Sequence, residues 1–180
     1  MQTFLPYPDF EQTAAVLDDR RLGKQRVEGL QIVRAITVPG YAWRNHPAAL
    51  MWKGHEEALE SYLTSVCDEW ERRGFPDTCR ASIRTALDAA GVAAPLPQAV
   101  LAMEDRLPPW LGDEALHRSH RASLLLKDPG WYRQFFPSSD AEGWDGYVWP
   151  VRSPRIQAGT GRRRERVSRY HGRRRTLTRG

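Results

Sequence analysis

The apolar side chains between residues 48 and 70 constrain the fold most, because they recur at steps of three and four. They are Ala48, Trp52, His55, Leu59, Leu63, Val66 and Trp70. This spacing places them on one face of an α-helix. No stretch of useful length alternates between apolar and polar residues, as a half-buried strand would. The sequence therefore predicts an all-α fold.

Capping residues and helix breakers divide the chain into about four to five helices. Asp9 begins a capping-box pattern, and we expect the first helix to run from there to about Ile36. Asn45 is the expected cap of the second helix, with Pro47 in its first turn and an end near Gly74. Further helices are predicted over residues 78–90 and 113–127, and residues 92–109 should form a connection with at most a short helix.

Length and composition favour one globular, cytoplasmic domain. The 180 residues are 41% hydrophobic, which is enough for a real core. No apolar run approaches the roughly 20 residues that cross a bilayer. Two cysteines, Cys67 and Cys79, are too few for a disulfide framework or a cysteine-based zinc site. We expect a monomer without cofactor or metal, although His117 and His120 lie three residues apart, with Asp113 as the nearest third ligand.

The net charge of +5 is divided unevenly between a body at 1–151 and a tail at 152–180. The tail carries eleven arginines and one acidic residue, Glu165, whereas the rest of the chain has 16 basic and 21 acidic residues. Such a segment cannot bury enough apolar surface to order itself, so the tail is expected to be disordered. It would bind nucleic-acid phosphates. The alternative is a tail that serves only solubility or localisation. The candidate phosphate contacts are Arg162, Arg163, Arg164, Arg173, Arg174 and Arg175.

The stretch LDDRRLGKQRVEGLQ, residues 17–31, contains a candidate catalytic site. Arg21, Lys24, Glu28 and Gln31 follow at steps of three and four, so their side chains can meet on one helix face. A second face of the same helix should be apolar, with Val27 among its members. One carboxylate among several cations suits chemistry on a phosphodiester backbone. The alternative is a solvated helix face with a simple Lys24–Glu28 ion pair.

Three segments together resemble the pyrimidine-dimer DNA glycosylases, the family of the phage endonuclease V. They are LDDRRLGKQRVE, NHPAALMWKGHEEALESYLTSVCDEWERRGF and HRSHRASLLLKDPGWYRQFFP. The resemblance implies a compact helical enzyme that removes a damaged pyrimidine from duplex DNA and then cleaves at the abasic sugar. It also implies that a terminal amine attacks C1′ to form a Schiff base, and that Glu28 assists ring opening and proton transfer.

Imine formation by a terminal amine is reasonable on chemical grounds. A protein α-amino group has an ordinary pKa of about 7.7–8.0, against about 10.4 for a lysine side chain. At neutral pH a far larger fraction of it is therefore an uncharged nucleophile. Gln2 is too bulky for ready removal of Met1, so the amine would be that of Met1 itself. Lys24 is a second candidate nucleophile. A third possibility is a monofunctional glycosylase that uses Glu28 with an activated water.

Several residues around these segments are expected to hold the DNA. They are Arg21, Arg26, Asn45, His46, His120 and Arg121. For His46 the alternative is a capping or core role. Two rival functions remain open at this point. One is a non-catalytic DNA-binding protein with a basic arm, and the other is an enzyme that acts on another modified base.

Overall fold

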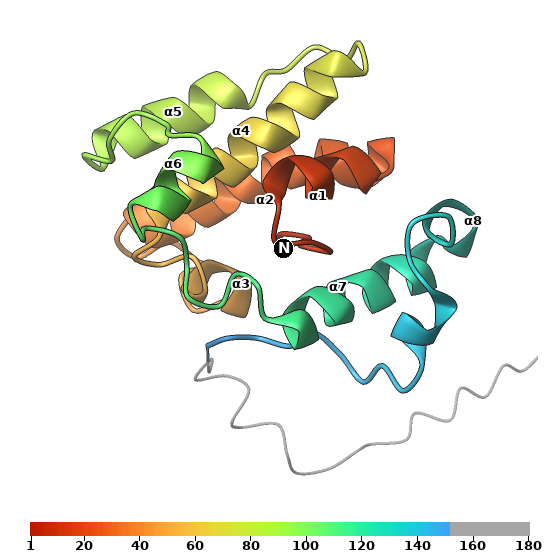
Figure 1. The fold of residues 1–180 in the computed structure, drawn as a ribbon. Helices are drawn as coiled ribbons and strands as arrows, with labels where there is room; N and C mark the ends of the chain where they lie inside the picture. The colour runs from red at the N-terminus through yellow and green to blue at the C-terminus, as the bar shows by residue number, and fades with distance from the viewer. Residues whose placement is uncertain (152–180) are drawn as a thin grey trace, which may run out of the picture.

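The computed structural model describes residues 1–151, which form an all-helical body without strands in that range (Figure 1). This confirms the predicted fold class. The elements are α1 (Phe10–Val16), α2 (Asp19–Thr37), α3 (Pro47–Leu50), α4 (Glu56–Arg72), α5 (Arg80–Ala89), α6 (Gln98–Met103), α7 (Glu114–Lys127), α8 (Pro129–Tyr132) and the 3₁₀ helix η1 (Ser138–Ala141). The expected disordered tail at 152–180 lies outside the described residues.

The prediction of one helix from Asp9 to Ile36 is wrong, because the chain breaks between α1 and α2. Leu17 is extended, and the Asp18 side chain accepts a hydrogen bond from the Arg21 backbone N–H. Asp18 thereby caps a new helix. Apolar residues continue through the break, which hid it from the periodicity. Val27 is also not on the apolar face, since it is 48% exposed.

The second predicted helix is likewise two helices, α3 and α4. Residues 51–55 form turns between them, and Gly54 takes a positive φ of 84°. His46, not Asn45, caps α3, because its Nδ1 accepts the hydrogen bond from the Ala48 backbone N–H at 3.1 Å. Both interruptions raise the number of helices above the expected four to five. The end of α4 beside Gly74 is as predicted.

The later helices follow the sequence closely. α5 ends just before Gly91, which takes a positive φ of 74°. The connection after it holds one short helix, α6. Asp113 caps α7 by accepting a hydrogen bond from the Ala115 backbone N–H at 2.9 Å. Local capping signals therefore predicted these boundaries correctly.

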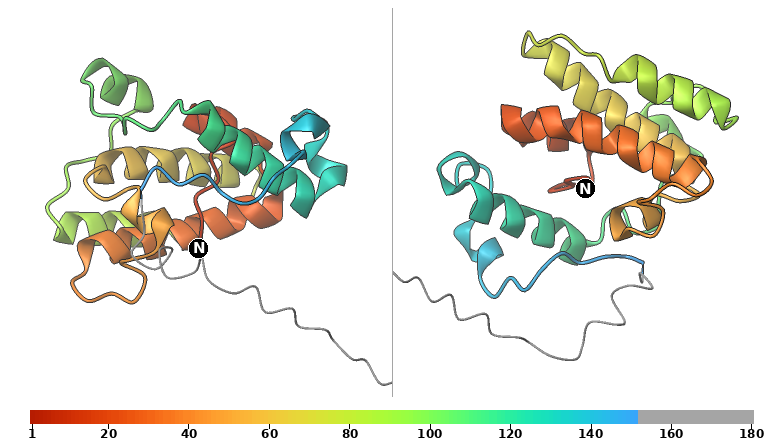
Figure 2. Two further views of the ribbon diagram at one scale, coloured as in Figure 1. Left: turned by 90° about the horizontal axis from the view of Figure 1, so that it is seen from below. Right: turned by 180° about the vertical axis from the view of Figure 1, so that it is seen from behind.

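The core lies where α1 and α2 pack against α4 (Figure 2). Gly29 permits the close approach of α2 to α4, because a Cβ there would lie 2.1 Å from Leu63 Cδ2. The fully buried Trp52 ring contacts Trp110 at 5.0 Å and Tyr62 at 5.8 Å between centroids. Such contacts bury large apolar areas. Cys67 is a buried free thiol in this core.

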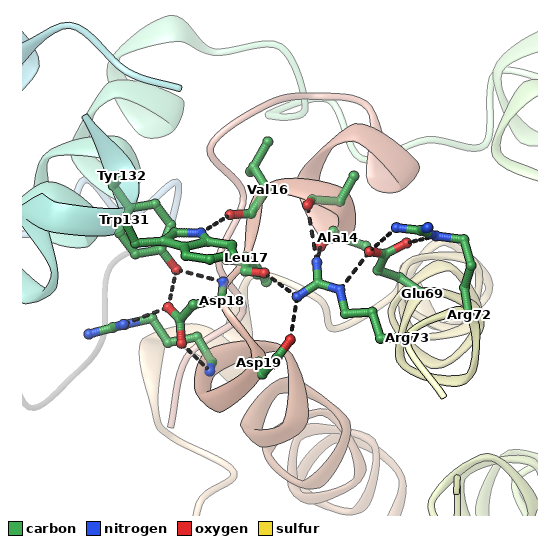
Figure 3. A network of polar contacts seen from close by, with 12 residues as sticks. Ala14, Val16, Leu17, Asp18, Asp19, Glu69, Arg72, Arg73, Trp131 and Tyr132 are labelled. Atoms are coloured by element: carbon green, nitrogen blue, oxygen red, sulfur yellow. Dashed lines mark hydrogen bonds and ion pairs between the residues drawn. The ribbon is translucent and has the colours of Figure 1, made fainter. Parts of the chain in front are cut away.

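Arg73, at the end of α4, ties that helix to the α1–α2 break (Figure 3). Its guanidinium donates hydrogen bonds to the carbonyls of Leu17 at 2.7 Å and Ala15 at 3.1 Å, and to Asp19 Oδ1 at 2.8 Å. Its Nε also donates to Glu69 Oε1 at 2.7 Å. The last carbonyls of a helix lack intrahelical donors, and this one side chain pairs with two of those at the break, Ala15 and Leu17.

The other side of the break is held by α8. The Tyr132 hydroxyl donates to the Asp18 carboxylate and accepts from the Asp18 backbone N–H at 3.2 Å. The Trp131 indole N–H donates to the Val16 carbonyl at 2.9 Å (Figure 3). These contacts place α8 against the start of α2. They hold the candidate site's main helix from its N-terminal end.

Replacing Arg73 with lysine is expected to lower the free energy of unfolding by about 1–3 kcal/mol, because lysine cannot serve several buried acceptors in one plane. Arg72→Lys is the matched control: Arg72 is 71% exposed on its side chain and pairs with Glu69 alone. That variant should keep nearly the full free energy of unfolding of the native chain. Urea unfolding followed by circular dichroism measures both. Equal losses in the two variants would contradict this account of Arg73.

Candidate active site

Residues 1–5 run through the middle of the fold and are fixed there by their backbone. The backbone N–H groups of two alternate residues point to polar side chains of α2: Gln2 donates to Glu28 Oε2 at 3.1 Å, and Phe4 donates to Gln25 Oε1 at 2.8 Å. Leu5 donates to His120 Nδ1 on α7 at 2.8 Å. The amino terminus consequently lies between α2 and α7, as Figures 1 and 2 show.

Other helices hold the same segment from its remaining sides. The Trp52 indole N–H donates to Thr3 Oγ1 at 2.9 Å. The single O–H donor of Tyr62 is shared between the Phe4 carbonyl at 3.0 Å and Gln25 Oε1 at 2.8 Å. His117 Nδ1 donates to the Leu5 carbonyl at 2.7 Å. Because these backbone groups are paired at almost every residue, the position of the terminal amine is set by the whole fold.

Glu28 is the carboxylate at which this segment and α2 meet. Its Oε1 lies 4.0 Å from the Met1 amine and 3.7 Å from Lys24 Nζ, which is one helical turn earlier. The Glu28 side chain is 18% exposed, whereas that of Lys24 is 67% exposed. The expected Lys24–Glu28 pair is therefore present, and it is joined by a second amine. Two potential nucleophiles, the Met1 amine and Lys24 Nζ, therefore lie beside one potential proton-transfer group, the Glu28 carboxylate.

A cleft of about 410 Å³ opens over these groups. Its wall carries four cations, one carboxylate, two amides and two aromatic rings. The lining residues are Met1, Gln2, Phe4, Arg20, Arg21, Lys24, Gln25, Glu28, Lys127 and Tyr147. An excess of positive charge around a single carboxylate suits a phosphodiester ligand.

The two predicted arginines of α2 differ in their surroundings. Arg21 lines the cleft, pairs with Asp18 and lies over the Tyr132 ring with its guanidinium carbon 5.5 Å from the centroid. Arg26 lies on another side of α2, paired with Asp77 and 4.1 Å from the Trp70 ring centroid. The Arg26 side chain is 10% exposed, so it contributes packing at α2 and not charge to the cleft.

His46 lies near the cleft, directly after Asn45. Burial lowers the pKa of His46, and the positive charge of the Met1 amine lowers it further, while Glu28 acts in the opposite direction. Because Nδ1 accepts from Ala48, the neutral ring carries its proton on Nε2. Its ring also meets Trp149 edge to face at 6.1 Å. His46 therefore caps α3, which was the alternative role considered for it, and also lies near the Met1 amine and Glu28.

His120 and Arg121 are more enclosed than the sequence suggested. His120 is fully buried, and burial lowers its pKa to about 3. Arg121 pairs with Asp140 and Glu114 and donates to the Pro6 carbonyl at 3.1 Å. Both residues hold the N-terminal segment in place. The predicted tail contacts, Arg162–Arg164 and Arg173–Arg175, lie outside the described residues.

Sequence reasoning missed Gln2, Gln25, Arg20, Lys127 and Tyr147 as cleft residues. Gln25 lies three residues before Glu28 and could have been found on the same helix face. Lys127 and Tyr147 carry no such signal, because only the packing of distant segments brings them here. Within residues 1–151, no group of three histidine, cysteine or acidic side chains could hold a metal ion. No helix in that range is long and apolar enough to span a membrane.

Residues 1–82 match the family described as pyrimidine dimer DNA glycosylase, which confirms the resemblance over α1 to α4. The match covers a little under half of the chain. It includes both the terminal segment and Glu28. No curated protein and no solved structure matches the chain.

Proposed function

We propose that the protein removes pyrimidine dimers from duplex DNA through an imine and then cleaves the strand as an AP lyase. The observation that carries this proposal is the approach of the Met1 amine to Glu28, with 4.0 Å between the nitrogen and Oε1. An amine beside a carboxylate in a cationic cleft is the arrangement that imine chemistry on a nucleotide requires. The family match at residues 1–82 supports the substrate class.

In the proposed reaction the nitrogen lone pair of Met1 attacks C1′ of the damaged nucleotide. The bond from C1′ to the base breaks, and the base takes the electron pair and a proton but stays joined to its neighbour through the cyclobutane ring. The nitrogen loses a proton, the C1′–O4′ bond breaks, and O4′ takes up a proton, which gives the Schiff base. Removal of a C2′ proton then expels the 3′ phosphate, and water releases the aldehyde from the amine. Glu28 is the group that donates and accepts these protons.

The Met1 amine is favoured over Lys24 as the nucleophile by two features. The Met1 side chain is 1% exposed, and the following backbone is held on all sides, so its amine has a fixed direction. The Lys24 side chain is 67% exposed and must be ordered before it can react. Gln2 supports the same site, because its nitrogen already lies 3.1 Å from Glu28 Oε2 and would become the terminal amine if Met1 were removed.

The rim of the cleft would hold the phosphates on either side of the reacting nucleotide. Arg20, Lys24 and Lys127 are exposed on it, and Arg21 is fixed by Asp18. Asn45 and His46 would contact the backbone from α3. The tail arginines at 162–164 and 173–175 would add affinity without sequence preference. Arg26, His120 and Arg121 would support these contacts from behind and not touch DNA.

Borohydride trapping tests the proposal. Native protein and Lys24→Arg are incubated with a thymine-dimer duplex and with an abasic-site duplex, reduced, and digested for peptide mass spectrometry. We expect a covalent adduct on the amine of the N-terminal peptide in both proteins, because arginine keeps the charge of residue 24 but forms no imine. An adduct that disappears in Lys24→Arg would transfer the nucleophile to α2. Base release without any adduct would indicate a monofunctional glycosylase, and binding without base release a DNA-binding protein.

A further inference from the structure

One aromatic ring close to the cleft is left largely in solvent. Trp43 lies in the turns between α2 and α3 and is 47% exposed. The backbone around it is fixed, because the His46 N–H donates to the Trp43 carbonyl at 2.9 Å. Both the backbone N–H and the guanidinium of Arg44 donate to the Tyr41 carbonyl, each at 3.2 Å. The indole is therefore presented by a hydrogen-bonded turn that carries a positive charge beside it.

A row of rings connects Trp43 to the cleft. The Trp43 ring meets the His46 ring edge to face at 5.8 Å between centroids, and His46 meets Trp149 in the same way at 6.1 Å. Trp149 contacts Tyr147 at 5.6 Å, and Tyr147 lines the cleft. His46 is also close enough to the terminal amine for that charge to act on its pKa. The exposed indole is thus the outer end of a row that starts beside the reacting groups.

The reacting groups themselves are recessed in the protein. The Met1 side chain is 1% exposed and the Glu28 side chain is 18% exposed. A sugar carbon in a straight, fully stacked duplex is held away from so recessed an amine, so the DNA must bend or open a base step to reach it. An opened step leaves the face of a base without its stacking partner, which is unfavourable. A flat aromatic side chain at the rim can replace that partner.

The size and the surroundings of the exposed ring favour a nucleobase over a protein as its partner. Stable protein interfaces bury about 1,200–2,000 Å² of surface, far more than one indole offers. The exposed side chains of Arg44 and Lys53 line one hollow beside the end of α2, where they suit a flanking phosphate. An aromatic ring beside cations is the combination with which proteins hold single bases.

We propose that Trp43 stacks on the face of a nucleobase that becomes exposed when the duplex bends toward the terminal amine, and so stabilises the bent DNA. The indole replaces stacking that the bend removes. A straight, undamaged duplex presents no such face, so the contact favours DNA that a dimer has already distorted. This inference rests on the proposed function for its substrate, and it adds a positioning residue that does not line the cleft.

Trp43→Leu and Trp43→Phe test the contact, because leucine keeps apolar bulk without a ring and phenylalanine keeps a ring. Both are made in the Glu28→Gln background, so that the dimer stays intact, and duplex binding is measured by fluorescence anisotropy. Trp43→Leu should weaken binding to a thymine-dimer duplex by about tenfold, and to the undamaged duplex by less than about twofold. Trp43→Phe should stay within about threefold of native affinity for both duplexes. Met103→Ala is the control and should change neither value, since Met103 is 87% exposed on α6 and does not line the cleft.

2-Aminopurine in the DNA distinguishes stacking on the indole from general packing. Its fluorescence is low when its ring is stacked and rises when it is unstacked. Placed singly at positions around the dimer on both strands, it should brighten several-fold at one of them when Trp43→Leu replaces the native side chain in the complex. Identical fluorescence at every position would overturn the inference. So would equal affinities of the leucine and phenylalanine variants, or equal losses on damaged and undamaged DNA.

Borohydride trapping on an abasic-site duplex keeps this inference separate from the proposed function. Trapping by the native protein, alongside any of those contrary results, would leave the proposed function standing and remove Trp43 from it. Failure of the native protein to trap, with the dependence on the ring intact, would reject the lyase and keep the stacking contact.

Discussion

Glu28→Gln is expected to lower the rate of base release from a thymine-dimer duplex by about 10²–10⁴-fold, the usual contribution of a positioned acid–base group. Glutamine has the same shape and can still accept the hydrogen bond from the Gln2 backbone N–H, which lies 3.1 Å from Glu28 Oε2. The terminal segment should therefore remain in place. What is lost is the group that exchanges protons with the sugar and the leaving base.

Single-turnover base release and duplex binding measure this expectation together. DNA affinity should fall by less than about threefold or even rise, because the variant removes a negative charge from a cationic cleft. Glu56→Gln is a suitable control, since Glu56 is an acidic residue in the first turn of α4 and does not line this cleft. Full base release by Glu28→Gln would remove Glu28 from the mechanism. A parallel loss of thermal stability would instead assign it a structural role.

The free energy of unfolding is expected to fall by about 1.4 kcal/mol for each pH unit below about 6, through the titration of His120. Burial lowers the pKa of His120 to about 3 in the folded protein, against 6.5 for a free histidine. Between these values the unfolded chain binds the proton and the folded chain does not. Acid therefore favours unfolding, and the stabilisation is fully present only above pH 6.5.

The variant His120→Asn isolates this contribution. Asparagine can place its Oδ1 where Nδ1 accepts from the Leu5 backbone N–H, and it does not titrate. Burial also lowers the pKa of His117, so this neighbour keeps its own part of the slope in the variant. Urea unfolding between pH 5 and 7 should show a slope smaller by about one proton in His120→Asn. Equal slopes in the two proteins would mean that His120 takes up a proton without unfolding.

The sequence predicted helix boundaries well wherever a single capping residue or glycine marks them. Asp9 and Asp113 cap α1 and α7 as their positions suggest, and Gly74 and Gly91 follow α4 and α5. The two wrong predictions have a common cause. Apolar periodicity continues across the turns at Leu17 and around Gly54. The first break is made by one polar cap, Asp18, and the second by the positive φ of Gly54.

The sequence could predict which side chains of α2 lie together in the candidate site. It could not predict which distant segments pack against them. Glu28 and Lys24 share a helix face, so spacing alone places them together. Met1 reaches them only because Gln25 and His120 bind the backbone that follows it, and no local pattern encodes such a contact. For Arg26 and Arg121, charge alone led to the prediction of DNA contacts. The structure adds that acidic partners on distant segments pair with both guanidinium groups, which no local pattern encodes.

The threaded segment at residues 2–5 also has a consequence for how the protein folds. Leu5 is bound by His117 and His120, which are separated from it by 112 and 115 positions along the chain. During synthesis these early residues must wait until α7 has emerged before their backbone is fully paired. Closing so long a loop is entropically unfavourable and slow compared with forming the helices. We therefore expect the cleft to form late, after α2 and α4 have already packed together.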